Sequence, residues 1–389
     1  MNRSMGAGPC KGSRRASPRK TCERLRRGAP TCYGQDSFRR APTMSESPDD
    51  LVIGGVSIAP GERRSVELRV ARLYDFTELS MSVEVIRGKK PGPVLAVTAA
   101  VHGDEIGGVE IVRRLLNSRA VRHLRGTLIA IPIVNVFGFN SLSRYLPDRR
   151  DLNRSFPGSE TGSLAARMAH LLVSEVVSQC THAIDLHSGA VHRANLPQIR
   201  AHLDDPDTER LARAFHVPVI LNSDLRDGSL RESAVRLGIP MLLFEGGEAL
   251  RFEEKVAKSG LRGILNVMRV LGMADPGRTR SLGGHDVFQA ESAHWVRAPQ
   301  SGIFRSKAQL GTRVLTGERL GLVSDPTGSR EEPVLALHDG IVIGLLRLPL
   351  VSRGDALVHV ATFENLDSVT DSIEEFEAAL LLKRGDVAD

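Results

Sequence analysis

Between residues 93 and 273, two hydrophobic spacings alternate along the chain. Short apolar runs bounded by turn-forming residues are typical of buried strands, and apolar residues three and four apart are typical of helices. The predicted strands are 93–101, 127–134, 182–186, 217–221 and 239–244, and the predicted helices are 106–116, 164–180, 229–237 and 253–271. Strands alternating with helices predict an α/β fold, with a mixed, mostly parallel sheet flanked by helices.

The pattern is that of β structure on both sides of this region. Residues 53–87 contain segments in which apolar and polar residues alternate, as in half-buried strands. After residue 283, short β runs are separated by glycines, and segments 298–304 and 336–344 are weak internal copies. Such paired hairpins predict a small C-terminal β-barrel or sandwich. A capping box of Ser372 and Glu375 predicts a short final helix over 371–384.

The net charge of +6 is concentrated in one terminal segment. Residues 1–43 contain 11 Lys and Arg against Glu23 and Asp36, so this segment carries +9 and the remaining chain carries −3 (+6 minus +9). The segment is rich in Gly, Ser, Pro and Arg, and we expect a disordered extension upstream of a second start at Met44. Because the body is not basic, nucleic acid is excluded as a partner.

Cysteine usage and the apolar segments indicate the environment of the protein. Three of the four cysteines lie in the basic extension and only Cys180 lies in the body, which excludes a disulfide scaffold and favours a cytoplasmic location. The longest apolar stretches are too short to cross a bilayer, so no membrane partner is expected. The basic extension also lacks the apolar core of a secretory signal.

The first candidate metal ligands are His102 and Glu105, which lie at the junction of a predicted strand and helix. An imidazole and a carboxylate three residues apart can point toward one zinc ion, although such a pair is a weak signal by itself. The carboxyl ends of strands in open α/β sheets are where ligands bind. His187 also ends a predicted strand and is the third candidate, and Asp185 could orient its imidazole. His182, at the other end of that strand, is interpreted as structural.

A candidate general base ends a further predicted strand. Glu245 follows four apolar residues and precedes Gly246 and Gly247, a position that a structural role explains poorly. A carboxylate beside a metal-activated water can accept and return its proton. Glu248 is the competing candidate, and we expect it at the surface. A catalytic zinc with three protein ligands would complete the centre.

A long polar loop over 135–158 follows the second predicted strand and carries five candidate substrate-binding residues. Long loops in compact domains are often functional, and guanidinium groups bind carboxylates or stabilise an oxyanion. The candidates are Arg144, Arg149, Arg150, Asn153 and Arg154.

Four segments in this order resemble the succinylglutamate desuccinylase/aspartoacylase family, a branch of the zinc carboxypeptidase-like hydrolases. They are H-G-D-E from His102, R-Y followed by D-L-N-R-S-F-P-G from Arg144, D-L-H-S-G from Asp185 and F-E-G-G-E from Phe244. The resemblance spans residues 50–362. It implies that His102, Glu105 and His187 bind one zinc ion and that Glu245 is the base and proton shuttle. It further implies that Arg144 polarises the scissile carbonyl, while Asn153 and Arg154 hold the substrate carboxylate. Arg149 and Arg150 receive no role.

The C-terminal β runs resemble the biotinyl/lipoyl-type fold, but the stretch 324–333 lacks the lysine that carrier proteins use. We therefore expect a lid or an assembly element there. The expected organisation is a basic extension (1–43), an N-terminal β segment (44–90), a catalytic domain (91–283), a β-barrel domain (284–362) and a helical tail (363–389).

The expected activity is zinc-dependent hydrolysis of the amide in an N-acyl amino acid or a similar small carboxylate substrate. A zinc carboxypeptidase acting on peptides would use the same residues and stays open. A non-catalytic protein that binds acidic ligands is the alternative of another class. Assembly into a homo-oligomer is also left open.

Overall fold

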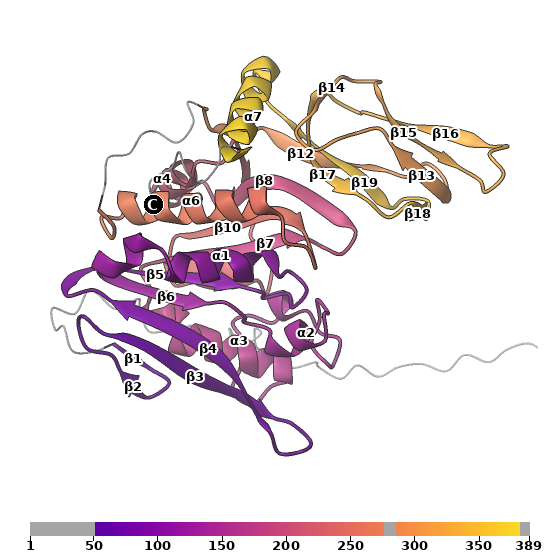
Figure 1. Cartoon of the computed structure of the whole chain (residues 1–389). Helices are drawn as coiled ribbons and strands as arrows, with labels where there is room; N and C mark the ends of the chain where they lie inside the picture. Colours follow the sequence, from indigo (N-terminus) through magenta and orange to yellow (C-terminus); the bar gives the residue numbers. More distant parts are fainter. Residues whose placement is uncertain (1–50, 276–284, 382–389) are drawn as a thin grey trace, which may run out of the picture. The chain divides into compact units, whose positions relative to one another are not determined.

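A mixed sheet of 13 strands runs through the part of the chain that the computed structural model describes, residues 51–275 and 285–381 (Figure 1). The basic extension lies outside these residues. The strands of the α/β region are β3 (Arg63–Arg72), β4 (Glu78–Arg87), β5 (Lys90–Ala99), β6 (Arg125–Ile131), β7 (His182–Gly189), β8 (Arg193–Ala201), β9 (Val219–Asn222) and β10 (Met241–Glu248). A small hairpin of β1 (Val52–Ile53) and β2 (Val56–Ser57) precedes them.

Four neighbouring strands at the centre of the sheet, in the order β10, β7, β5 and β6, are parallel. The strands on either side are antiparallel to them, with β4 beside β6 and β8 beside β10. The prediction of an α/β fold with a mixed sheet is therefore confirmed. The parallel arrangement places the carboxyl ends of β5, β7 and β10 at one edge.

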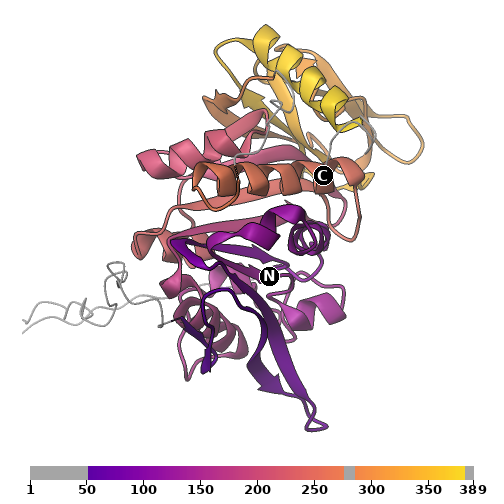
Figure 2. The same cartoon turned by 60° about the vertical axis from the view of Figure 1, so that its left-hand side comes forward.

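Helices cover both faces of the central sheet (Figures 1 and 2). They are α1 (Gly107–Leu116), α2 (Val136–Asn140), α3 (Leu164–Glu175), α4 (Pro206–Phe215), α5 (Leu230–Arg236) and α6 (Glu254–Val270). One hydrophobic core joins α1, α4 and α6 to residues such as Val97 and Phe244. A second core joins α3 and α5 to Ala96 and Met241 on the opposite face. Since side chains alternate along a strand, Asp185, His187 and Glu245 belong to the α3 and α5 face.

Strand β8 was not predicted from the sequence, because Pro197 interrupts its apolar pattern and proline cannot donate to a ladder. In the structure, Pro197 lies where β8 changes partners on one side, from β17 to β9. The β8 pairing with β10 is irregular at the same place. The proline is accommodated because no regular ladder bond is required of it there.

The C-terminal strands form two groups. They are β11 (Phe288–Ala290), β12 (Ser292–Arg297), β13 (Gly302–Ser306), β14 (Arg313–Val314), β15 (Arg319–Ser324), β16 (Glu331–Leu335), β17 (Gly340–Leu346), β18 (Leu350–Val351) and β19 (Ala356–Thr362). Strands β13, β15, β16 and β18 form a separate four-stranded sheet. Strands β12, β19 and β17 instead continue the central sheet, because β17 pairs with β8. The sequence did not indicate this continuity.

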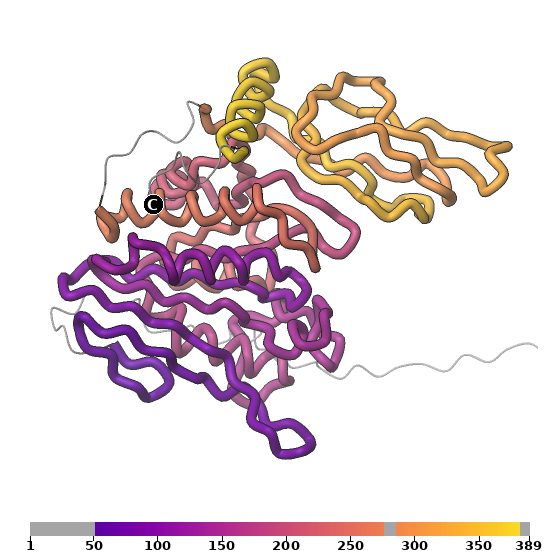
Figure 3. The backbone as a smooth tube through the Cα atoms, in the orientation of Figure 1, coloured from indigo at the N-terminus to yellow at the C-terminus, as the bar shows by residue number. Residues whose placement is uncertain are grey.

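The final helix, α7 (Leu366–Leu381), begins five residues before the predicted start. Ser372 therefore lies inside the helix, and the predicted capping box is wrong. The Ser372 hydroxyl donates to the carbonyl of Asp286, while Asn365 accepts from the amide of Ser368 at the helix start. Helix α7 contacts α6, as the backbone trace shows (Figure 3). No helix in the described ranges has the length and apolar character needed to cross a bilayer.

A buried histidine should make the stability of this region depend on pH. His359 on β19 stacks on Trp295, and burial, with Arg200 and His294 nearby, lowers its pKa to about 3. Below the unfolded-state pKa of about 6.5, the unfolded chain binds a proton that the folded chain does not. Stability is therefore lost as the pH falls below this value. When the pH is lowered from 7 to 5, we expect the unfolding free energy of the wild type to decrease by about 2 kcal/mol more than that of His359→Gln. Urea titrations of both proteins at the two pH values measure this difference. Equal losses would contradict the assignment.

Candidate active site

Two imidazoles and one carboxylate converge at the carboxyl ends of β5 and β7. His102 and Glu105 lie between β5 and α1, and His187 lies near the end of β7. All three side chains are buried, and one ligand atom from each lies within 4.8 Å of the others. Among residues 51–275 and 285–381, this is the one group of three or more His, Cys, Asp or Glu residues with a metal-binding arrangement.

The distances within this group fit a metal centre. Nδ1 of His102 and Nδ1 of His187 are 3.2 Å apart, and the Glu105 oxygens lie 2.7 and 2.8 Å from these two nitrogens. Two nitrogens bound to one tetrahedral zinc ion would lie about 3.3 Å apart, given zinc–nitrogen bonds of about 2.0–2.1 Å. The three side chains therefore have the composition and spacing of a catalytic zinc site, which takes three protein ligands and keeps one position open.

A second carboxylate contacts the outer nitrogen of each imidazole. Asp185 Oδ2 lies 2.7 Å from Nε2 of His187, and its other oxygen accepts from the Thr98 hydroxyl at 2.7 Å. Asp151 Oδ1 lies 3.3 Å from Nε2 of His102. Such carboxylates fix the ring orientation and direct the inner nitrogen toward a metal. The sequence pointed to Asp185 through strand alternation, but Asp151 was missed because nothing local relates its loop to His102.

The pKa shifts of the three side chains favour protonated imidazoles and an ionised Glu105 carboxylate. Burial disfavours the charged form of both imidazoles, but Glu105 raises the pKa of His102, and Asp185 with Glu105 raises the pKa of His187 well above its usual value. Burial likewise disfavours the carboxylate of Glu105, yet the two histidines hold its pKa below the usual range. Protons and a metal ion would thus compete for the imidazoles, so metal affinity should decrease as the pH falls.

Close packing places the polar loop over 135–158 beside His102, Glu105 and His187. We call this loop the arginine loop and these three residues the metal group. Gly103 lies directly against the backbone of Gly138, since a Cβ on Gly103 would be 2.0 Å from the Gly138 carbonyl carbon. Only glycine permits this approach of α2. Asn135 accepts from the amide of Gly138 and donates to the carbonyl of Arg144, which fixes the start of the loop. These contacts hold residue 144 next to the metal group.

Of the predicted arginine-loop residues, the structure places Arg144 against the metal group and Asn153 next to Asp151, to which its backbone amide donates at 2.8 Å. The Arg144 guanidinium donates to Glu105 at 3.2 Å and to Asp151 at 3.1 Å. Asn153 is buried, and its side-chain oxygen accepts from the amide of Leu230 at 2.9 Å, which leaves its NH₂ group as the available donor. Arg154 is exposed, and its guanidinium donates to the carbonyl of Asn153. Arg149 and Arg150 are exposed, and Arg150 pairs with Asp148.

Glu245 lies beside the metal group on the adjacent strand, because it is in register with His187 in the β10–β7 pairing. Its Oε2 accepts from Nδ2 of Asn195 at 2.8 Å, and its Oε1 lies 3.9 Å from Nε of Arg200. Both of these residues come from β8. They were missed in the sequence because β8 itself was not predicted.

Glu248 is not at the surface, contrary to the expectation. It is 7% exposed and accepts from the amide of His192 and from the guanidinium of Arg347 on the C-terminal side of β17. These bonds give Glu248 a structural role between two loops. The local sequence could not show this, because Arg347 is 99 residues away.

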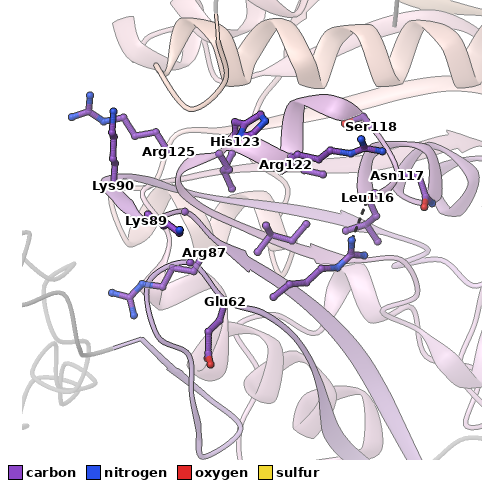
Figure 4. A pocket seen from close by; sticks show the side chains of 16 residues that line it. Glu62, Arg87, Lys89, Lys90, Leu116, Asn117, Ser118, Arg122, His123 and Arg125 are labelled. Carbon is purple, nitrogen blue, oxygen red and sulfur yellow. Dashed lines mark hydrogen bonds between the residues drawn. The ribbon is translucent and has the colours of Figure 1, made fainter.

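A separate cavity of about 820 Å³ lies at the other end of the strands. It adjoins the starts of β5 and β6, and its lining includes Arg63, Lys89, Lys90, Arg122 and Arg125 (Figure 4). None of the metal-group residues lines it. The cavity is therefore distinct from the candidate active site.

The chain is similar to several known proteins. Residues 91–271 match the model of the succinylglutamate desuccinylase/aspartoacylase catalytic domain. Over 284 residues, the chain is 29% identical to N-alpha-acetyl-L-2,4-diaminobutyric acid deacetylase of Halomonas elongata, covering 69% of this chain and 82% of that protein.

Solved structures share the fold. The crystal structure of a succinylglutamate desuccinylase/aspartoacylase from Rhodobacter sphaeroides is 26% identical, with a TM-score of 0.70, and the match covers 78% of this chain and 95% of that one. The product-bound ectoine utilization protein EutE (DoeB) of Ruegeria pomeroyi is 24% identical, with a TM-score of 0.70 and coverage of 78% and 97%. At 24% identity, the similarity to the Ruegeria protein shows a shared fold alone.

Proposed function

Residues 91–271 belong to the succinylglutamate desuccinylase/aspartoacylase catalytic-domain family, and from this membership we propose that the chain is a zinc-dependent amidohydrolase. Its substrate is an N-acyl amino acid or a similar small carboxylate. The observation that carries the proposal is the buried convergence of His102, Glu105 and His187, with Glu245 in register on the next strand. The family hydrolyses amides of this kind.

His102, Glu105 and His187 would hold the metal. Zinc bound there would supply a Lewis acid and lower the pKa of a coordinated water. Asp151 and Asp185 orient the two imidazoles through their outer nitrogens. The choice of two imidazoles and one carboxylate matches the donor set of known hydrolytic zinc centres.

Glu245 acts as the general base and then as the general acid. Its carboxylate accepts a proton from the attacking water and returns it to the leaving amine. The amide of Asn195 occupies one carboxylate oxygen of Glu245, which leaves the other oxygen for proton transfer. Arg144 polarises the scissile carbonyl from its position beside Glu105 and stabilises the oxyanion.

The NH₂ group of Asn153 and the guanidinium of Arg154 hold the substrate carboxylate. A planar guanidinium can bind a carboxylate through two parallel hydrogen bonds. The name of the Halomonas relative, a deacetylase of an N-acetyl amino acid, supports a substrate with an acyl amide next to a carboxylate.

An activity screen tests the proposed function. The full-length chain, loaded with zinc, is assayed against N-acetyl and N-succinyl amino acids and against short peptides, with amine release as the readout. We expect turnover of N-acyl amino acids at rates at least about a hundredfold above those of peptides. Preferred release of C-terminal residues from peptides would support a carboxypeptidase instead. Stoichiometric ligand binding without turnover would support a binding protein.

Asn195 is expected to act as a positioning residue for Glu245. Asn195→Ala removes the 2.8 Å hydrogen bond, so we expect kcat to fall by about 10–100-fold while KM changes by less than about threefold. Asn195→Asp places a second carboxylate against Glu245 and should reduce kcat further. Steady-state kinetics checks this, with exposed Asn117→Ala as the control. A parallel increase in KM would indicate a general structural role and contradict the assignment.

A further inference from the structure

The cavity at the amino ends of β5 and β6 is lined mainly by cations, and the proposed function does not use it. Among its described lining residues are six Lys and Arg side chains and one acidic side chain, Glu62, so the lining carries +5 (+6 minus 1) with His123 neutral. The chain outside residues 1–43 carries −3 in total, so positive charge is concentrated at this place. The six cations, which we call the basic cluster, are Arg63, Arg87, Lys89, Lys90, Arg122 and Arg125.

Backbone contacts fix the segments that form the cavity. The amide of Gly88 donates to the carbonyl of Gly126 at 2.8 Å, which joins the turn between β4 and β5 to the start of β6. A Cβ on Gly88 would lie 2.0 Å from the carbonyl oxygen of Leu124, so this approach requires glycine. Nη1 of Arg63 donates to the carbonyl of Leu116 at 3.4 Å and connects β3 to the end of α1. The cavity is therefore built into the folded framework.

Two members of the basic cluster are direct neighbours in the sheet. Lys90 and Arg125 are paired in the ladder between β5 and β6, and like charges at opposed positions destabilise a sheet. Nε of Arg125 donates to the carbonyl of Pro91 at 2.9 Å, which leaves the outer nitrogens of the guanidinium as donors. Within residues 51–275 and 285–381, neither of the two forms an ion pair with a carboxylate, and the same holds for the exposed side chains of Lys89 and Arg122. An anion bound between Lys90 and Arg125 would relieve their repulsion.

The carboxylates near the cavity already have other partners. Glu62 accepts two hydrogen bonds from the guanidinium of Arg64, which is not a lining residue, at 3.3 and 3.1 Å. Glu84 lies 3.6 Å from Arg63 and partly matches its charge. The hydroxyl of Ser118, also in the lining, is buried and has no hydrogen-bond partner among the described residues. Four cations and one hydroxyl of the lining thus lack a protein partner of complementary chemistry.

The size and charge of the cavity indicate the class of ligand. Its volume of about 820 Å³ lies within the range of about 300–1,000 Å³ that is typical of small-molecule sites. A phosphate group carries about −1.5 to −2 near neutral pH, so two linked phosphates would balance four cations, whereas one carboxylate would not. Ammonium and guanidinium groups both bind phosphate oxygens. Figure 4 shows Lys90 and Arg125 on one side of the cavity and Arg122 on the other, so these cations can contact different phosphates.

We propose that the basic cluster binds a small anion with two or more linked phosphates. Inorganic pyrophosphate and a nucleoside diphosphate present this same chemistry. Strand β5 runs from the cavity to the segment that carries His102, and its ten residues at about 3.3 Å each span roughly 30 Å. The anion therefore binds far from the metal group and does not compete with the substrate there. This proposal does not depend on the proposed function.

Calorimetric titration of the full-length, zinc-loaded chain tests the proposal. The probes are pyrophosphate, ADP and sulfate, which differ in the number of linked anionic groups and in the presence of a nucleoside. We expect one pyrophosphate per chain, bound at least about tenfold more tightly than sulfate. Equal affinities for pyrophosphate and ADP would identify the linked phosphates as the ligand, whereas tighter binding of ADP would identify a nucleotide. Equal affinities for pyrophosphate and sulfate would overturn the proposal.

Variants of the basic cluster assign the binding to the cavity. Lys90→Gln and Arg125→Gln should each weaken pyrophosphate binding by about tenfold, and the exposed Lys307→Gln after β13 should keep the wild-type affinity. Lys90→Glu places opposite charges at the paired positions, so it should abolish binding and raise the melting temperature. Wild-type affinity in all of these variants would assign the anion to the basic residues of 1–43 and overturn the proposal.

Two further measurements exclude other sites and other partners. His187→Ala should keep the affinity for pyrophosphate, and loss of binding in this variant would place the anion at the metal group and overturn the proposal. A 20-base-pair RNA duplex is titrated in the same way, because a basic surface can also bind the backbone of a nucleic acid. If Lys90→Gln weakened binding of this duplex while pyrophosphate did not bind the wild type, the partner would be a nucleic acid and the proposal would be wrong.

Discussion

Glu245→Gln is expected to reduce kcat by at least about a thousandfold while one zinc ion per chain is retained. The substitution keeps the shape of the side chain and its contact with Asn195, but the amide cannot accept the proton of the attacking water. Glu245 is not one of the three metal-group residues, so metal content should be preserved. Steady-state kinetics together with metal analysis of the same preparation measures both quantities.

Glu248→Gln provides the matched control, because it lies on the same strand and undergoes the same chemical change. Glu248 binds His192 and Arg347 and does not contact the metal group, so we expect kcat within about tenfold of wild type and a lower melting temperature. If Glu248→Gln lost activity and Glu245→Gln kept it, the assignment of the base would be reversed.

Removal of the metal is expected to abolish activity without unfolding the chain. The metal-group residues lie at the edge of a sheet whose two hydrophobic cores do not include them, so the fold should persist. Dialysis against a chelator should reduce turnover to below about 1%, and one equivalent of zinc should restore it. His187→Ala should bind no stoichiometric zinc, as measured by metal analysis.

His182→Ala is the control for the metal site, since His182 lies at the opposite end of β7 and pairs with Asp207. This variant should retain one zinc ion. Full activity in a metal-free preparation would refute both the zinc assignment and the proposed mechanism. Zinc binding should also weaken at acidic pH, because Glu105 and the two aspartates favour protonation of the imidazoles.

Local sequence patterns were sufficient for the elements that bear the metal group. The apolar runs before His102, His187 and Glu245 correspond to β5, β7 and β10, and a buried parallel strand requires such a continuous run. Because parallel strands end at one edge, these residues could be expected to meet before any distance was known. Strand alternation likewise placed Asp185 on the same side as His187.

The supporting contacts could not be deduced in this way. Asp151 reaches His102 from a loop, and Asn195 and Arg200 reach Glu245 from a strand that Pro197 concealed. The capping box at Ser372 was compatible with a helix start, but α7 already begins at Leu366. The Ser372 hydroxyl instead bonds to the carbonyl of Asp286, in the segment before β11. In each case the decisive interaction joins residues far apart in sequence.

The sequence by itself predicted the α/β fold and the strand ends at which His102, Glu105, His187 and Glu245 come together, because both follow from periodicity and from the common edge of parallel strands. The tertiary structure alone decided which charges surround Glu245 and how β17 joins β8. Strand order and side-chain contacts depend on packing between distant segments, and no local pattern encodes them.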